Sequence, residues 1–262
     1  MTHFFKIFVL ALLFSLPAEA AEFITVASTT STQNSGLFSH ILPKFTQTTG
    51  IDVHVVAVGT GQAILNAKRG DADVLFVHHR PSEEAFVAEG HGVKRYDVMM
   101  NDFVIVGPKP LSGVATAQEA FSALAKAQSK FISRGDNSGT HKRELSLWVK
   151  KPSGSWYREV GAGMGATLNI AKSMNAYTLT DRGTWISFQN KGDLKIAFEG
   201  GEDLQNPYGV ILVNPKKHPH VKAKAGQAFI DWLVSSKGQA AIAEFSIKGQ
   251  QLFFPTARVS SH

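Results

Sequence analysis

Four stretches of the chain concentrate hydrogen-bond donors where a predicted strand is followed by a predicted helix. They are residues 28–32 (Ser-Thr-Thr-Ser-Thr), 59–62, 133–140 and 163–167. The first turn of a helix has backbone N–H groups without partners and a partial positive charge, so it attracts anions. Glycines let the backbone approach a ligand, and hydroxyl groups add neutral donors. One serine or threonine before a helix is usually only a cap, but five consecutive hydroxyls exceed that need. The pattern predicts an anion-binding site.

Other chemistries are less well supported. Ser138 and His141 could serve as nucleophile and base of a secreted hydrolase, but the sequence has no Gly-x-Ser-x-Gly elbow. His78 and His79 are adjacent on a strand and point to opposite faces, which favours a structural role over metal binding. Gly59-x-Gly61 lacks the third glycine and the distal acidic residue of a dinucleotide-binding fingerprint. We therefore expect no enzymatic activity, no cofactor and no resident metal.

Composition narrows the class of protein further. The 262 residues include 44% apolar and 18% charged residues, which is typical of a globular chain long enough to bury a sizeable core. The formal net charge of +6 suits attraction of anions, but no block of Lys and Arg marks a nucleic-acid-binding arm. The absence of cysteine excludes disulfides, thiolate metal sites and cysteine nucleophiles.

Residues 1–20 have the layout of a secretory signal peptide. A single Lys6 precedes an apolar stretch of about ten residues, and the segment ends in Ala18-Glu19-Ala20. A membrane anchor would need roughly twenty apolar residues, so this run is too short to span a bilayer. No cysteine follows for lipidation. These features predict export, and a mature protein that is free in the periplasm.

The remainder alternates strands and helices. Short β-branched runs at 22–27, 53–58 and 74–77 are separated by stretches with helical periodicity, which predicts an open α/β sheet with right-handed crossovers. The apolar strands 103–106 and 210–213 flank about 100 residues with their own strands and helices, enough for a second lobe. We predict a two-strand hinge, lobe one at 21–105 and 212–262, and lobe two at 106–211.

The same residues resemble the tungstate-binding proteins of bacterial ABC transporters, and the resemblance runs from about Ile24 to Pro255. Its motifs are Ser28-Thr29-Thr30-Ser31, Val58-Gly59-Thr60-Gly61-Gln62, Asp71-Ala72-Asp73-Val74, the run 101–108, the run 133–142, Tyr177 to Trp185, Asn206 to Val210, and Gly249 to Pro255.

The resemblance implies the type II periplasmic-binding-protein fold, with two lobes that each hold a mixed, mostly parallel sheet flanked by helices. It also implies that the ligand is tungstate, to a varying degree molybdate, and that the partner is the membrane permease of an ABC transporter. Sulfate and phosphate stay open as alternative ligands. We expect a monomer that does not bind nucleic acid.

Position and resemblance together predict the ligand-binding residues. They are Thr29, Thr30, Ser31, Thr60 and Gly61 in lobe one, and Arg134, Ser138, Gly139, Thr140 and Thr178 in lobe two. Gly61 and Gly139 are expected to act through their backbone N–H groups. Arg134 is predicted to be the one charged residue that contacts the anion, because helix ends offer only partial charge. Asp136 and Asp181 are expected to face structural partners, and Arg182 to support the second lobe.

Overall fold

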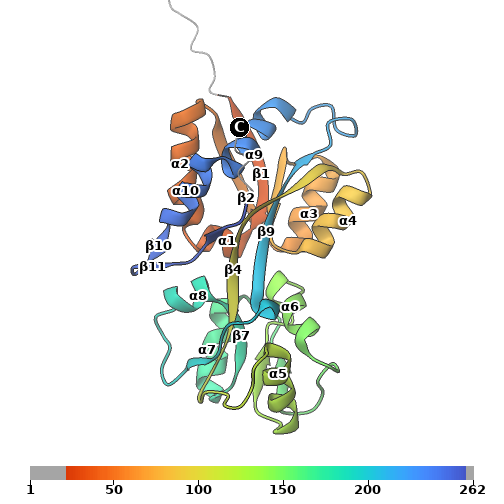
Figure 1. Ribbon diagram of the computed structural model, residues 1–262. Helices are drawn as coiled ribbons and strands as arrows, with labels where there is room; N and C mark the ends of the chain where they lie inside the picture. Colours follow the sequence, from red (N-terminus) through yellow and green to blue (C-terminus); the bar gives the residue numbers. More distant parts are fainter. Residues whose placement is uncertain (1–21, 258–262) are drawn as a thin grey trace, which may run out of the picture.

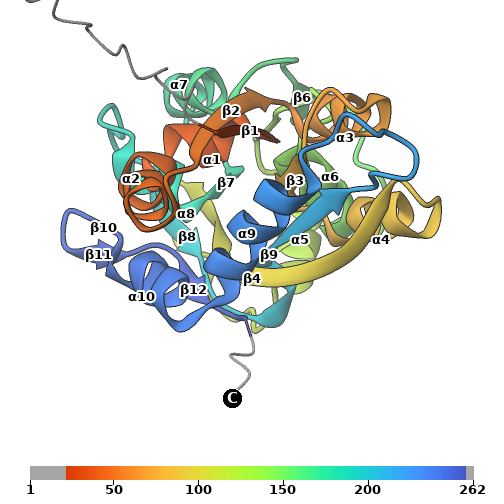
Figure 2. The ribbon, with the colours of Figure 1, turned by 90° about the horizontal axis from the view of Figure 1, so that it is seen from above.

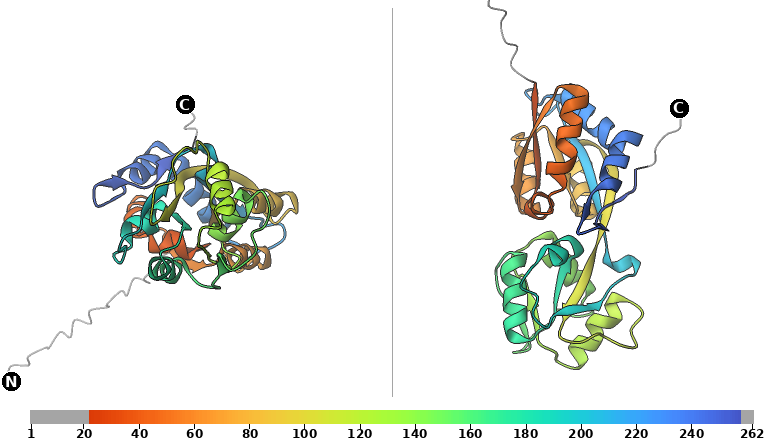
Figure 3. Two further views of the ribbon diagram at one scale, coloured as in Figure 1. Left: turned by 90° about the horizontal axis from the view of Figure 1, so that it is seen from below. Right: turned by 90° about the vertical axis from the view of Figure 1, so that its left-hand side faces the viewer.

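The computed structural model describes residues 22–257, so the predicted signal peptide at 1–20 lies outside the described residues. Figure 1 shows two lobes, one above the other, with two long strands running between them. Figure 3 shows the same arrangement from the side, with the blue C-terminal segment returning to the upper lobe. The two-lobed α/β fold with a two-strand hinge is therefore confirmed.

The strands are β1 (Phe23–Thr29), β2 (Asp52–Val58), β3 (Val74–Val77), β4 (Gly92–Gly107), β5 (Phe131–Ser133), β6 (Tyr157–Glu159), β7 (Thr178–Asp181), β8 (Lys195–Phe198), β9 (Gln205–Val213), β10 (Ser246–Ile247), β11 (Gln250–Gln251) and β12 (Phe254–Pro255). The helices are α1 (Thr30–Asn34), α2 (Leu37–Thr49), α3 (Thr60–Arg69), α4 (Arg80–Ala88), α5 (Ala117–Lys126), α6 (Gly139–Leu147), α7 (Met164–Met174), α8 (Arg182–Ser187), α9 (Ala223–Val234) and α10 (Ser236–Glu244), with a 3₁₀ turn at Glu202–Leu204.

The sheet of lobe one has the order β12-β4-β9-β3-β1-β2. Strands β1, β2 and β3 are parallel, β9 is antiparallel to β3, and β4 is antiparallel to β9. The first part of β4 therefore runs in the same direction as β1 to β3. The carboxyl ends of the three parallel strands meet at one edge, where loops gather in open α/β sheets.

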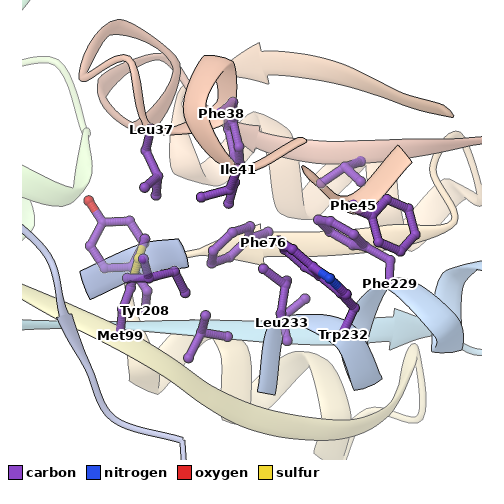
Figure 4. Packing of buried hydrophobic residues seen from close by; sticks show 14 of the residues in the cluster. Leu37, Phe38, Ile41, Phe45, Phe76, Met99, Tyr208, Phe229, Trp232 and Leu233 are labelled. Carbon is purple, nitrogen blue, oxygen red and sulfur yellow. The ribbon is translucent and has the colours of Figure 1, made fainter. Parts of the chain in front are cut away.

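Side chains of β3 alternate between the two faces of this sheet. Val74 and Phe76 pack in the cluster formed with α2, α9 and α10, and Leu75 and Val77 pack with α3 and α4. Figure 4 shows the larger cluster, in which Phe38, Phe45, Phe76, Phe229 and Trp232 lie together. Figure 2 shows α2 and α10 on one side of the strands and α3 and α4 on the other. Burial of both faces fixes the position of the sheet, and with it the edge at which the carboxyl ends of β1, β2 and β3 meet.

The sheet of lobe two is built on the second part of β4. Strands β7 and β8 are both antiparallel to β4, and β5 is parallel to β6 and bridges to Tyr177 next to β7. Strands β5 to β8 thus share one direction. Strand β5 ends at Ser133, where the donor-rich stretch 133–140 begins.

Both hinge strands exchange one core for the other along their length. On β4, Val98 and Met99 pack in lobe one, and Phe103 and Ile105 pack in lobe two. Along the second connection, Leu204, directly before β9, packs in lobe two, and Tyr208 on β9 packs in lobe one. This packing favours crossing points within residues 99–103 and 204–208, a few residues before the lobe boundaries predicted at 105/106 and 211/212.

Candidate anion-binding site

A cavity of about 420 Å³ lies between the lobes. Its lobe-one wall is formed at the carboxyl ends of β1, β2 and β3, and its lobe-two wall by the loop after β5 and the start of α6. The lining residues are Thr29, Thr30, Ser31, Val58, Gly59, Thr60, Gly61, Gln62, His78, Arg134, Asp136, Asn137, Ser138, Gly139, Thr140 and Gly163. Thr30, Ser31, Arg134 and Gly163 also line a second cavity of about 410 Å³ toward α7 and α8.

The structure brings nine of the ten residues predicted from the sequence to this cavity. Thr178 is the exception, because it pairs with Val106 at the start of β7, and the end of that strand nearer the cavity is Asp181. Thr178 is buried within lobe two. Its predicted contact with the ligand has no support from this geometry.

Besides the five-residue α1, three longer helices begin at the cavity. The lining includes Gly59 and Thr60 at the start of α3, Ser138 and Gly139 at the start of α6, and Gly163 before α7. None of these helices has an acidic residue in its first turn. Their partial positive charges add at the cavity, which favours an anion there, and Asp136, which accepts from Ser138 N–H at the start of α6, offsets part of them.

The hydroxyls that follow β1 form a connected network. Thr29 Oγ1 caps α1 by accepting from Thr32 N–H at 3.3 Å, and it lies 2.7 Å from Thr32 Oγ1 and 3.1 Å from Ser31 Oγ. Ser28 turns the other way and donates to the Phe76 carbonyl at 2.6 Å. Of the five consecutive hydroxyls, two are therefore buried in structural hydrogen bonds (Ser28 and Thr32), and Thr29, Thr30 and Ser31 line the cavity.

Arg134 is the only Lys or Arg among the cavity-lining residues of the described chain. Its Nε and Nη2 donate to Asp136 Oδ2 at 3.1 Å and 2.5 Å. Asp136, expected to face away from the site, lines the cavity instead because the guanidinium holds it there. Its other oxygen accepts from Ser138 N–H at 3.2 Å. Both carboxylate oxygens are thus engaged, and Arg134 Nη1 makes no hydrogen bond within the described residues.

The protonation state of Asp136 follows from these contacts. Burial acts to raise its pKa, but hydrogen bonds from Ser138 and Arg134 outweigh it and hold the pKa of Asp136 below its usual value. The carboxylate is therefore charged at neutral pH and is occupied as an acceptor. It compensates part of the positive charge of Arg134.

The loop that carries Arg134 needs a left-handed backbone. Gly135 has φ +60°, and a Cβ there would lie 2.8 Å from Glu159 Cβ, so only glycine fits. Asn137 also has a positive φ of 59°, and its N–H donates to His141 Nδ1 at 3.1 Å. Ser138 Oγ accepts from His141 N–H at 3.2 Å as the cap of α6. Ser138 and His141 are thus arranged as cap and loop anchor, and their side chains do not pair as nucleophile and base.

Two charged residues near the site have structural partners, as predicted. Asp181 Oδ1 caps α8 by accepting from Thr184 N–H at 2.8 Å, and its Oδ2 accepts from the Thr184 hydroxyl at 2.6 Å. Arg182 donates to both carboxylate oxygens of Asp102 on β4, at 2.7 Å and 2.6 Å. Neither residue lines the cavity.

His78 is one of seven lining residues outside the predicted set, and the others are Val58, Gly59, Gln62, Asp136, Asn137 and Gly163. His78 directly follows β3, and the residue is 7% exposed. Nε2 lies 3.2 Å from Ser31 Oγ, and Nδ1 lies 3.1 Å from Asn206 Oδ1 on β9. Burial lowers the pKa of His78 to about 4, so the ring is neutral at physiological pH. Its place at the end of a parallel strand, next to the ends of β1 and β2, was the signal that could have identified it.

The lobes touch on two sides of the cavity. A Cβ on Gly139 of lobe two would lie 3.0 Å from His78 Cε1 and 3.4 Å from Thr60 Oγ1, both in lobe one. On the other side, Ile186 of α8 packs into the lobe-one cluster. Gly139 therefore permits an approach that a larger residue would obstruct.

Residues 17–237 match the family model described as a PBP superfamily domain. A tungstate-binding protein TupA from Peptoclostridium acidaminophilum is 46% identical over 253 residues, covering 91% of this chain and 87% of the relative. This chain belongs to the PBP superfamily and, within it, to the TupA tungstate-binding proteins.

Two solved structures agree with this family. The tungstate-binding protein TupA of Desulfovibrio alaskensis G20 is 41% identical, with a TM-score of 0.82, and covers 91% of this chain and 100% of its own. A structure described as the tungstate ABC transporter from Geobacter sulfurreducens is 48% identical, with a TM-score of 0.79, and covers 87% and 100%. Within residues 22–257, no helix is both long and apolar enough to cross a membrane.

Proposed function

We propose that this protein captures tungstate between its two lobes, without enzymatic turnover, and delivers it to the permease of an ABC transporter. The observation that carries the proposal is the convergence of one arginine, three helix N-termini and a row of hydroxyls on one cavity. Membership of the TupA family gives the anion its identity. In this proposal tungstate is cargo, molybdate is a second cargo, and no cofactor takes part.

The donors in the cavity suit an oxyanion that carries no proton. Tungstate is a tetrahedral dianion at neutral pH, so all of its oxygens accept hydrogen bonds. Phosphate is partly protonated and gains from a free acceptor that takes its proton. The carboxylate in this cavity, Asp136, is already engaged by Arg134 and Ser138. Sulfate carries no proton either, so its smaller size must distinguish it. Molybdate has nearly the same size and charge, so only small differences over several short hydrogen bonds can separate it from tungstate.

The cellular setting follows from the same proposal. The predicted signal peptide exports the chain to the periplasm, where a monomer collects the anion and presents it to the permease. Two lobes that touch around the cavity suit this task, since closure removes the anion from water and the closed shape differs from the open one.

Calorimetric titration with tungstate, molybdate, sulfate and phosphate tests the proposal. We expect tungstate to bind most tightly with one site per chain, and phosphate most weakly. Tighter binding of phosphate than of tungstate would overturn the assignment. Incubation with ester and phosphoester substrates tests the competing hydrolase function, which would be supported by turnover that the Ser138→Ala variant loses.

A further inference from the structure

His78 stands where three parts of the molecule meet. Its ring lines the anion cavity on one side and a smaller cavity of about 170 Å³ on the other. It contacts Ser31 of the cavity wall and Asn206 of the hinge, and a Cβ on Gly139 of lobe two would lie 3.0 Å from its Cε1 atom. The ring also lies against Tyr208 on the same hinge strand, with centroids 4.7 Å apart.

Asn206, the hinge residue that His78 contacts, is itself held in place by a hydrogen bond. Asn206 on β9 and Asn101 on β4 are directly opposite each other in the ladder that joins the hinge strands. Asn206 Nδ2 donates to Asn101 Oδ1 at 2.7 Å, which turns Asn206 Oδ1 toward His78. Both asparagines are buried, and neither lines the anion cavity. The position of the His78 ring is therefore set by the hinge.

These contacts determine where the proton of the imidazole lies. An amide oxygen only accepts hydrogen bonds, so Nδ1 of His78 must donate to Asn206 Oδ1. A neutral imidazole with its proton on Nδ1 has a lone pair on Nε2. Ser31 Oγ then donates its single proton to Nε2, so Ser31 can offer an anion its backbone N–H but not this hydroxyl proton, and the hydrogen bond fixes the place of Ser31 at the cavity wall.

We propose that His78 is a positioning residue that ties Ser31, at the anion cavity, to the Asn101–Asn206 pair of the hinge strands. This proposal rests on the proposed function for the identity of the anion. In this role the ring holds Ser31 at the wall that an anion contacts, and the hinge holds the ring. Gly139 completes the arrangement from lobe two, because its missing side chain leaves room for the ring edge. Disturbing the hinge end of this chain of contacts therefore disturbs anion binding.

Two substitutions test the two ring nitrogens of His78 separately. In His78→Gln the amide reaches the place of Nε2 and keeps a partner for Ser31, but it loses Asn206. In His78→Asn the amide stays at the place of Nδ1 and keeps Asn206, but it loses Ser31. We expect each variant to bind tungstate about tenfold more weakly than the wild type, because each breaks one of two hydrogen bonds in series.

The decisive measurement is a double-mutant cycle with Asn206→Ala, followed by calorimetry with tungstate. Asn206→Ala alone should weaken binding about tenfold although Asn206 does not line the cavity, and it should add less than twofold to His78→Gln or to His78→Asn. The neighbouring exposed residue Gln205 supplies the control, since Gln205→Ala should bind like the wild type. Circular dichroism and thermal unfolding establish that each variant is folded. Additive losses, or wild-type affinity in a folded Asn206→Ala variant, would overturn the proposal.

A measurement without ligand separates this inference from the proposed function. The ¹⁵N chemical shifts of the His78 ring in the ligand-free protein should report a neutral ring with its proton on Nδ1. A proton on Nε2 would refute the linkage to Asn206 whether or not tungstate binds. A wild-type protein that shows the expected tautomer but does not bind tungstate would instead refute the proposed function, and with it the effect on binding.

Discussion

The two lobes contribute different chemistry to the cavity. Lobe one supplies neutral hydroxyls and backbone groups on Thr29, Thr30, Ser31 and Thr60, at the ends of strands whose positions are fixed by a two-sided core. Lobe two supplies the charge, on Arg134, from a loop with two left-handed residues and a carboxylate that holds the guanidinium. The difference suggests a division of tasks, in which lobe one provides a rigid cradle and lobe two compensates the anion's charge as the lobes close.

The largest effect is expected from Arg134→Ala. A dianion taken out of water needs a compensating charge, and helix ends provide only part of it. We expect a loss of roughly 3–5 kcal/mol, about 10²–10⁴ in tungstate affinity by calorimetry. Arg134→Lys should recover part of this, because the charge returns without the planar fork.

Asp136 sharpens this test. In Arg134→Ala its carboxylate stays at the cavity without a cation, so part of the loss is repulsion of the anion. The double variant Arg134→Ala, Asp136→Asn should therefore bind more tightly than Arg134→Ala alone. A folded Arg134→Ala variant that binds tungstate within threefold of wild-type affinity would contradict the claim that lobe two compensates the charge of the anion.

The next largest effect is expected from Gly139→Ala, which probes the approach of lobe two. The added Cβ would lie 3.0 Å from His78 Cε1, so the lobes must separate slightly or the ring must shift. Overpacking of this kind costs about 1–3 kcal/mol, which corresponds to roughly 5–150-fold in affinity if it falls on the closed state alone. Gly61→Ala is the matched control, because a Cβ there meets no atom within 4 Å. Equal affinities for the two variants would contradict a closure that depends on Gly139.

A smaller effect is expected from Thr60→Val, which removes one neutral donor of lobe one and keeps the shape of the side chain. The loss of one hydrogen bond to a charged group is worth about 1.5–3 kcal/mol at most, and neighbouring donors should compensate in part. We therefore expect tungstate affinity to fall roughly tenfold. A loss as large as that of Arg134→Ala would show that lobe one carries the affinity as much as lobe two does.

The smallest effect on binding is expected from Arg182→Ala, at the start of α8 in lobe two. Arg182 pairs with Asp102 and Glu199 and not with the cavity. Its loss should leave tungstate affinity within about threefold and lower the free energy of unfolding by about 1 kcal/mol, since the pair is partly exposed. Urea denaturation and calorimetry on the same sample measure both. A large loss of affinity without a loss of stability would make Arg182, too, a ligand-binding residue.

The sequence predicted the parts of the fold that depend on local patterns. Buried β-branched runs such as 74–77 and 103–106 became strands, and the helix after Gly59 begins at Thr60 as expected. The first half of β4, from Gly92, was not predicted, because Lys94, Arg95 and Asp97 interrupt its apolar pattern. Arg95 and Asp97 are stabilised by ion pairs, such as Arg95 with Glu83 at 2.7 Å and Asp97 with Arg80 at 2.6 Å, which only the folded chain brings together.

The candidate site shows the same limit. Hydroxyl-bearing residues and glycines at strand ends could be identified as site residues from the sequence, because these residue types at such positions are typical of anion binding. His78 could not be assigned from its type alone, since its role depends on Asn206, 128 residues later in the chain. Thr178 was selected as part of a motif, but the direction of β7 places it at the end of the strand away from the cavity.

The most direct test of the account is a crystal structure with tungstate bound, using the anomalous scattering of tungsten to locate the anion. We predict one strong peak in the cavity between the lobes, with oxygens within hydrogen-bond distance of Arg134 and of the hydroxyls that follow β1. A peak that contacts one lobe only, or that lies outside this cavity, would contradict the division of tasks between the lobes.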